Sequence, residues 1–531
     1  MKDKTASPPK RRNLTAGAEM GMSPALRRFL YATAAISGAA ILIIEILGAK
    51  MLAPYVGTSH FVWTAQIAVT LVALSAGYYV GGHLVDRSTR LGYLYLCILV
   101  AAVYLCLAVV ICEPVAYWCL QFRLALGALL SSVVLFLIPL TLLGTTTPFL
   151  VRILAQSLDA VGGQVGRLSA ISTLGSVAGT VLIGYVLIPF LPNSVTMLLT
   201  AGFLVVMALG YFFIWGRKER MAGSTVLGLF MAVTLGVFGI IKENTGHPPG
   251  LMEIYRANSN FGLLQVFELT NGGGRVFLND YLYQNGYDPA EKKSLFAFTY
   301  MLHGLARAYN PRIHDVLCIG MGVGIVPMQF AQEGARVDVV EINPAVLPLA
   351  VRFFDLEPDK LNIVFADGRY FLNQTVRLYD AIVLDAFLGD SSPSHLMTRE
   401  AFHAVQRHLK PGGTLVMNTF GEAVLGQDFM TASVDKTLES VFSRVRIHTG
   451  GGGNVFFVAA DRKDLTFVNP VSLDGVHPAA LEYVKAGFNH TIQANPAHGR
   501  VLTDDYNPVE YYDAANREFI RRQNAMSVRP Q

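Results

Sequence analysis

The chain has 531 residues, of which 52% are hydrophobic and only 15% are charged, and its mean hydropathy is +0.42. A soluble protein carries about 25% charged residues, so this composition excludes a purely soluble protein and favours several domains, one of them in a membrane. The net charge of +4 is small, which argues against nucleic acid as a partner.

Apolar runs of membrane-spanning length follow a basic N-terminal segment. Residues 1–24 have no cleavage site behind a short apolar segment, so we expect a disordered tail rather than a signal peptide. The runs, roughly 20 residues each, lie near 29–48, 62–82, 91–111, 126–144, 170–191, 195–215 and 223–242. Residues 25–242 are therefore predicted to be a multi-pass helical domain in the lipid bilayer of the cell (plasma or inner) membrane, with about seven spans.

Some side chains in or beside these runs have two interpretations. Glu45 is either a functional acid or a residue paired near the membrane surface, with Lys50 as one partner, and both interpretations stay open. The five cysteines lack the spacing of a metal site, so we interpret them as buried apolar residues and predict no metal. A disulfide between Cys112 and Cys119 is the less favoured alternative.

A second domain is predicted from residue 252 to residue 515, between a turn-rich linker at 243–251 and a tail at 516–531. It is expected to begin with strands at 252–260, 261–270 and 275–283, with a hairpin turn at 271–274, followed by a helix at 291–309. Strands and helices then alternate, and this part includes helices at 398–409 and 427–440 and a turn at 410–413. A pair of strands at 444–450 and 453–460 ends the series. This order predicts an α/β doubly wound domain with a seven-stranded sheet, preceded by a β-hairpin region.

A glycine-rich turn opens the most informative stretch of this domain. A buried strand at 316–319 runs into Gly320, Gly322 and Gly324 and then into a helix. Glycines let the backbone pass close under a ligand, and the start of the helix offers free N–H groups. Glu341 ends the next strand about 20 residues later, the spacing at which a carboxylate binds ribose hydroxyls.

Two further strand ends carry acids. Asp367 and Gly368 follow the third strand, and Asp385 follows the fourth. Any one of these acids, taken alone, is explained as a solvated strand-end residue or a helix cap. The ordered series instead favours a nucleoside pocket at the C-terminal edge of a parallel sheet, with one carboxylate left for chemistry.

These motifs together resemble the spermidine synthase family, and more narrowly its membrane-fused members. The resemblance includes the hairpin opening, GMGVG, VEIN, ADG, LDAF and the closing motif Leu502–Glu510, and it covers about residues 252–515. It implies a class I methyltransferase-like fold. The residues that it assigns to S-adenosylmethionine, or to its decarboxylated form, are Gly320, Gly322, Gly324, Glu341, Asp367 and Gly368.

The implied activity is transfer of an aminopropyl group to an amine such as putrescine by a membrane-anchored enzyme. Asp385 matches the family's catalytic aspartate and can accept the proton of the attacking amine. Gln284 and Asp390 are weaker candidates for binding the amine. A homodimer is a further hypothesis.

Departures from the family pattern lie at the amine end. Val323 replaces an acid in the glycine turn, Asn343 replaces the acid after VEI, and residues 297–299 read Ala-Phe-Thr where the family shows Tyr-His-Glu. Fewer acids mean fewer partners for a desolvated dication. Two alternatives therefore stay open: an S-adenosylmethionine-dependent methyltransferase, and a non-catalytic membrane protein that binds a nucleoside or a polyamine.

The predicted orientation in the membrane conflicts with the predicted use of an adenosyl compound. Basic residues in alternate loops, such as Arg87, Arg152 and Arg217, predict a cytosolic N-terminus. An odd number of spans then places the second domain outside the cytosol, where adenosyl compounds are not expected. Either one span is miscounted or the domain faces out. The stretch 126–155, with its breaks at Gly144 and Pro148, is the candidate for a miscount.

Overall fold

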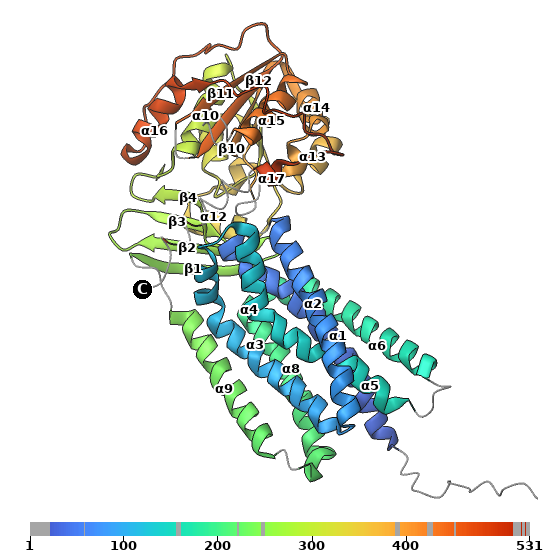
Figure 1. Ribbon diagram of the computed structural model, residues 1–531. Helices are drawn as coiled ribbons and strands as arrows, with labels where there is room; N and C mark the ends of the chain where they lie inside the picture. Colours follow the sequence, from blue (N-terminus) through green and yellow to red (C-terminus); the bar gives the residue numbers. More distant parts are fainter. Residues whose placement is uncertain are drawn as a thin grey trace, which may run out of the picture.

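The computed structural model describes residues 22–57, 59–155, 161–219, 222–245, 250–387, 393–421, 428–450, 453–512, 522 and 526. The N-terminal part is an elongated helical bundle, and a mixed α/β domain lies at one end of it (Figure 1). The bundle consists of α1 (Pro24–Val56), α2 (His60–Arg87), α3 (Leu91–Cys119), α4 (Leu124–Gly144), α5 (Thr146–Leu154), α6 (Val161–Leu182), the π-helical turn η2 (Ile183–Leu187), α7 (Ile188–Phe190), α8 (Asn193–Ile214) and α9 (Ala222–Thr245).

Seven helical segments in the described chain are long and apolar enough to cross a membrane, which agrees with the predicted number. They are Pro24–Val56, His60–Arg87, Leu91–Cys119, Leu124–Leu154, Gly162–Phe190, Asn193–Ile214 and Gly223–Lys242. Most extend beyond the predicted runs because their less apolar ends continue the helix. The stretch suspected of a miscount forms α4 and α5 in direct succession and counts as a single segment, so the number stays odd.

Small residues allow the helices of the bundle to approach closely. On α6, a Cβ atom at Gly175 would lie 2.1 Å from the carbonyl oxygen of Ala35 on α1, and one at Gly179 would lie 2.7 Å from that of Ala39. Only glycine fits at such contacts, which are typical of helix packing in lipid. All five cysteines are free, so the alternative of a Cys112–Cys119 disulfide is wrong.

A five-stranded antiparallel sheet begins the α/β domain, in the order β1 (Leu251–Ser259), β2 (Gly262–Leu269), β3 (Arg275–Asn279), β4 (Leu282–Asp288) and β5 (Lys293–Ser294). The single strand predicted at 275–283 is wrong, because the chain turns back at Asp280 and Tyr281, whose φ angles are 48° and 62°. Asp280 accepts a hydrogen bond from the N–H of Leu263 (2.9 Å), and the Tyr281 ring lies 6.0 Å from that of Tyr55 on α1. These contacts hold two non-glycine residues in a conformation they rarely adopt.

A larger sheet of eight strands follows, with the order β13-β11-β12-β10-β9-β6-β7-β8. The strands are β6 (Asp315–Ile319), β7 (Arg336–Glu341), β8 (Asn362–Phe365), β9 (Tyr379–Leu384), β10 (Leu409–Phe420), β11 (Arg444–Thr449), β12 (Asn454–Ala460) and β13 (Thr491–Ile492). The strands from β10 to β8 in this order are parallel, and β11, β12 and β13 pair antiparallel. The sheet thus contains the seven expected strands and one more, the two-residue strand β13 at its edge.

Helices cover both faces of this sheet, which confirms the doubly wound fold. One face packs against α10 (Ala297–Tyr309), α11 (Ile325–Gln332), α12 (Val346–Phe353) and α16 (Pro478–Asn489), and the other packs against α13 (Gly368–Gln374), α14 (Arg399–Arg407) and α15 (Phe429–Glu439). The helix predicted from residue 291 begins only at Ala297, because Lys293 and Ser294 pair with β4.

The turn predicted at 410–413 lies inside β10 as a four-residue irregularity. Leu409 pairs with Tyr379 and Thr414 with Ala381, so these four residues lie opposite Asp380 alone. The Lys410 ammonium contacts the carboxylate of Asp380 at 3.0 Å, which holds the irregular segment against β9.

Candidate active site

A cavity of about 390 Å³ lies at the C-terminal ends of the parallel strands, between the two sheets and beside α10 and α16. It brings together most of the residues predicted to form the site: Gln284, Gly320, Gly322, Glu341, Asp367, Gly368 and Asp385. Gly324 does not line it. Asp390 lies outside the described residues.

The glycine turn brings the backbone against the neighbouring strand. Gly320 and Gly322 have φ angles of 93° and 52°. A Cβ atom at Gly320 would lie 2.2 Å from the carbonyl oxygen of Asp385, so a larger residue would separate β6 from the end of β9. Gly324 caps α11 with a φ of 87°, and a Cβ atom there would meet the side chain of Leu356 at 2.4 Å. Its left-handed backbone is a structural requirement of the turn.

Glu341 ends β7 with its carboxylate inside the cavity. The carboxylate accepts hydrogen bonds from the N–H groups of Met321 (2.9 Å) and Asn343 (2.8 Å). Burial raises the pKa of Glu341, and these backbone hydrogen bonds oppose the rise by stabilising the charged form. The second lone pair of each oxygen can still accept a hydroxyl, as the ribose of a nucleoside requires.

Asp367 is both a helix cap and a lining residue. Its Oδ1 accepts the N–H groups of Arg369 and Tyr370 at the start of α13, each at 2.9 Å, and its Oδ2 lies 2.7 Å from His395 Nε2. Burial would raise the pKa of Asp367, but the hydrogen bonds from Tyr370 and His395 outweigh it, and the pKa is lowered. The helix-cap interpretation and the place in the cavity are therefore both correct for this residue.

Asp385 follows β9 in a different environment. Its Oδ1 accepts one hydrogen bond, from Asn418 Nδ2 on β10 at 3.0 Å. Burial raises the pKa of Asp385 to about 6, and the hydrogen bond from Asn418 only partly offsets this effect. The Asn418 Oδ1 atom is buried and has no hydrogen-bond partner among the described residues. This part of the cavity thus holds a carboxylate whose burial is only partly compensated, next to an amide oxygen without a partner among the described residues.

Aromatic side chains form much of the remaining wall of the cavity. They are Phe277, Tyr283, Phe296, Phe298, Phe387, Phe420, Phe456 and Tyr483. Gln284 reaches the cavity because it is the extra residue of a bulge, since Phe277 pairs with Asn285 and Leu278 pairs with Tyr283. Apart from Glu341, Asp367 and Asp385, no acid lines the cavity among the described residues.

The departures from the family pattern have structural roles. Val323 is buried in the core, and its N–H donates to Asn285 Oδ1 (3.3 Å). Thr299 is buried and donates to the carbonyl of Phe296 at the start of α10. Asn343 donates through Nδ2 to Ser259 Oγ (3.1 Å), which ties the large sheet to β1. None of these three side chains offers a carboxylate to an amine.

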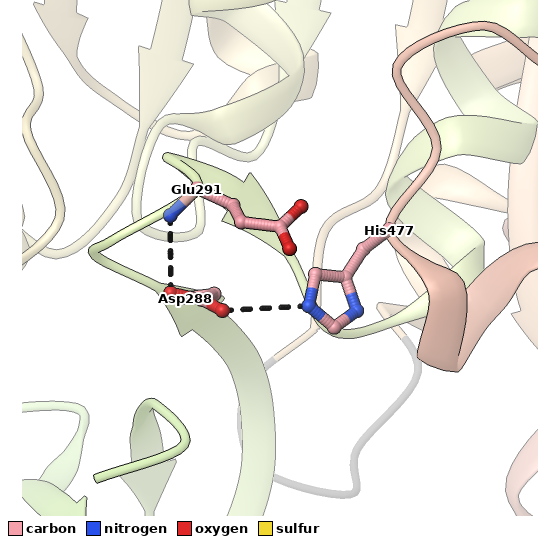
Figure 2. A group of neighbouring side chains, drawn as sticks. All are labelled: Asp288, Glu291 and His477. Carbon is pink, nitrogen blue, oxygen red and sulfur yellow. Dashed lines mark hydrogen bonds and ion pairs between the residues drawn. The ribbon is translucent and has the colours of Figure 1, made fainter.

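A group outside the cavity has the residue types of a metal site. Asp288, Glu291 and His477 have ligand atoms within 4.8 Å of one another, and Figure 2 shows them between the β4–β5 turn and the start of α16. His477 Nδ1 accepts the N–H of Ala479, so a neutral ring carries its proton on Nε2 and donates it to Asp288, 3.4 Å away. A metal-binding histidine instead donates its second ring N–H to a neighbour. This group therefore functions as a hydrogen-bonded link between the small sheet and α16.

Comparisons with known proteins agree with this geometry. The model of the spermine/spermidine synthase domain matches residues 295–463. The polyamine aminopropyltransferase of Vibrio vulnificus is 30% identical over 233 residues, which cover 42% of this chain and 77% of that protein. The chain belongs to the spermidine synthase (polyamine aminopropyltransferase) family.

Other similar proteins show less coverage or lower identity. The N-terminal histidine N-methyltransferase of Emericella nidulans is 28% identical over 221 residues, which cover 37% of this chain and 38% of that protein. The crystal structure of spermidine synthase from Thermotoga maritima is 19% identical, with a TM-score of 0.36, and the match covers 44% of this chain and 84% of that one.

Sequence reasoning missed Asn418, His395 and Asn285, which also line this cavity. Asn418 had a visible signal, because it is a polar residue within the apolar strand TLVMNTF. His395 and Asn285 carry no comparable signal, since their contacts to Asp367 and to the glycine turn depend on segments distant in sequence.

Proposed function

We propose that the chain is a membrane-anchored aminopropyltransferase that uses decarboxylated S-adenosylmethionine and an amine acceptor such as putrescine. The observation that carries the proposal is the position of Asp385. It lies in one cavity with Gly320, Gly322 and Glu341, so a base and a nucleoside-type site share one space.

The nucleoside end suits an adenosyl group. Gly320 and Gly322 keep the floor of the cavity free of side chains, and Glu341 offers acceptors for ribose hydroxyls. When bound, decarboxylated S-adenosylmethionine supplies a carbon activated by a sulfonium leaving group. The residues of the chain then have to hold the amine and remove its proton.

Asp385 is suited to that second task. Its pKa of about 6 keeps most of the carboxylate charged at neutral pH, so it can bind an ammonium group and accept a proton as the nitrogen attacks. Asn418 Oδ1 can accept another N–H of the same nitrogen and so fix its orientation. The aromatic wall excludes water, which would compete with the amine.

The decisive experiment gives the purified full chain decarboxylated S-adenosylmethionine with a panel of amines and measures release of methylthioadenosine. The proposal predicts release that depends on the amine and is lost in Asp385→Asn. Absence of release with every polyamine, although methylthioadenosine binds, would reject aminopropyl transfer and keep the nucleoside site.

Methyl transfer is the second candidate, because the chain is also similar to an N-methyltransferase. Calorimetry with the two cofactors distinguishes the candidates. Tighter binding of S-adenosylmethionine than of its decarboxylated form favours methyl transfer, and the reverse order favours aminopropyl transfer. Binding of both without turnover would favour the non-catalytic alternative.

The helical bundle is proposed to span the membrane seven times. With seven crossings, the α/β domain and the start of α1 lie on opposite sides, and the positive-inside rule then places the domain outside the cytosol, where the proposed activity requires a supply of the adenosyl substrate. Labelling of intact cells with an impermeant maleimide tests this orientation. Asp474→Cys, in an exposed loop of the domain, should react, whereas Thr89→Cys, between α2 and α3, should not. The opposite pattern would reverse the orientation. The homodimer stays a prediction.

A further inference from the structure

A second cavity, of about 400 Å³, lies where the helical bundle meets the small sheet and shares no lining residue with the first. Its walls come from α1, α3, the α7–α8 junction and α9 on the bundle side, and from β1, β2 and the β3–β4 turn on the sheet side. If the bundle spans a bilayer, this cavity lies at the level of the lipid headgroups on the side of the α/β domain.

Gln265 on β2 indicates that this cavity is built for a ligand that donates hydrogen bonds. The residue is completely buried and lines the cavity. Its Nε2 donates to Glu253 Oε1 at 3.2 Å, which fixes the orientation of the amide. The Oε1 atom has no partner among the described residues, and a buried acceptor without a donor is costly.

The surrounding side chains suit an ammonium group. Glu253, whose side chain is 10% exposed, and Glu113 place carboxylates on the wall. Three tyrosine rings lie beside them, with the Tyr55 ring 5.5 Å from that of Tyr117 and 6.0 Å from that of Tyr281. Carboxylates together with aromatic faces are the usual surroundings of a bound ammonium ion.

The charges of the wall favour a zwitterion over a simple cation. Lys242 contacts Glu113 at 3.0 Å, and Arg256 contacts Glu253 at 2.6 Å, so the two carboxylates are balanced by two cations that also line the cavity. A ligand with one positive and one negative group preserves this balance, whereas a diamine would add two uncompensated charges.

The cavity also offers apolar surface to a hydrocarbon chain. Met51, Val109 and Phe190 line it, and Phe190 is 76% exposed on the part of the bundle that lipid would cover. A large exposed aromatic residue beside a headgroup-sized cavity is typical of a surface in contact with acyl chains.

We propose that this cavity binds the headgroup of an aminophospholipid, with the primary ammonium between Gln265, Glu253 and the tyrosines and the phosphate near Lys242 and Arg256. The acyl chains would leave past Phe190. Because Tyr281 belongs to the turn that leads into Tyr283 and Gln284 of the first cavity, the lipid would contact the same hairpin that carries part of the proposed amine site.

Native mass spectrometry of the purified full chain in mild detergent tests the proposal without any assay of transfer. The probes are phosphatidylethanolamine, its N-methyl and N,N-dimethyl derivatives and phosphatidylcholine, which has the same phosphate but no N–H donor. Retention by the wild-type chain should fall with each methyl group, by about tenfold over the series, as expected for one charge-assisted hydrogen bond. Equal retention across the series would overturn the proposal, whatever the outcome of the transferase assay.

A matched pair of variants locates the effect. Gln265→Met should abolish the preference for phosphatidylethanolamine, whereas Gln66→Met should keep it, because Gln66 is equally buried but lies in the bundle away from the cavity. Loss of the preference in both variants would overturn the assignment. Displacement of the lipid by millimolar putrescine would also overturn it and would assign the site to a soluble diamine.

Discussion

The three carboxylates that line the first cavity are held by different kinds of hydrogen-bond donor. Glu341 and Asp367, which are proposed to bind the nucleoside, each accept two hydrogen bonds from backbone N–H groups. Asp385 receives one hydrogen bond from a side chain among the described residues, and its pKa is raised to about 6. Backbone donors stabilise the charged forms of Glu341 and Asp367, whereas a single side-chain donor offsets the burial of Asp385 only in part. The difference supports the proposed roles, in which Glu341 and Asp367 bind the nucleoside and Asp385 accepts the proton of the amine.

The largest effect should come from removing the reactive carboxylate. Asp385→Asn keeps the shape and the contact with Asn418 but cannot accept a proton, so kcat should fall by about 10²–10⁴-fold in the methylthioadenosine assay. Asp435→Asn is the matched control, because Asp435 is a half-buried acid with a pKa raised by burial to about 7 that lies on α15, outside the cavity. An equal loss of kcat in both variants would contradict the proposed role of Asp385 as the base.

The same substitution should stabilise the fold. The folded-state pKa of Asp385 is about 6 against an ordinary value of 3.8, so above pH 6 its buried charge destabilises the folded protein, by up to about 3 kcal/mol. Below pH 3.8 the carboxyl group is neutral in both states and this penalty is absent. Asp385→Asn should therefore raise the free energy of unfolding of the α/β domain at pH 8, and the gain should vanish as the pH falls from 6 to 4. A destabilised variant at pH 8 would contradict this reasoning.

Glu341→Gln should weaken the binding of the nucleoside. An amide offers one acceptor oxygen in place of two, so Met321 or Asn343 loses its acceptor, and methylthioadenosine affinity should fall roughly 10–100-fold by calorimetry. The pH dependence of turnover should remain unchanged. Glu357→Gln, at an exposed position, is the control and should behave as wild type.

Asn418→Leu should produce a smaller effect that distinguishes positioning from catalysis. Loss of the amide oxygen should raise the KM for the amine about tenfold, the value of one hydrogen bond to a charged group. Loss of the amide N–H should raise the pKa of Asp385, because this hydrogen bond lowers it. The acid limb of kcat/KM, expected at about pH 6 in the wild type, should therefore move upward. An unmoved limb would show that Asn418 does not act through Asp385.

The smallest effect is expected from metal removal. Because His477 Nδ1 accepts a hydrogen bond from Ala479, the group with Asp288 and Glu291 is assigned as a structural link. Dialysis against EDTA should leave the rate of transfer and the melting temperature unchanged. A drop in either that zinc restores would show that this link is a metal site.

Much of this organisation was predictable because it depends on local patterns. The helices of the bundle follow from apolar runs, and the glycine turn with Glu341, Asp367 and Asp385 follows from the rule that strand ends share one edge of a parallel sheet. Predictions failed where distant contacts override local preference. Tyr281 lies in the turn between β3 and β4 with a left-handed backbone that the sequence gives no reason to expect, and the contact with Tyr55 on α1 accompanies it.

The sequence by itself determined the apolar bundle, the alternation of strands and helices, and the acids at the strand ends, because hydropathy and periodicity are properties of neighbouring residues. Only the tertiary structure decided which of these acids has hydrogen-bond donors that offset the effect of burial on its pKa. Asn418 reaches Asp385 across 33 residues, and Gln265 Oε1 is buried without a partner among the described residues, beside the cavity between the small sheet and the bundle. Burial and hydrogen bonding depend on what folding brings together, so neither the pKa of Asp385 nor the burial of the Gln265 amide follows from neighbouring residues in the sequence.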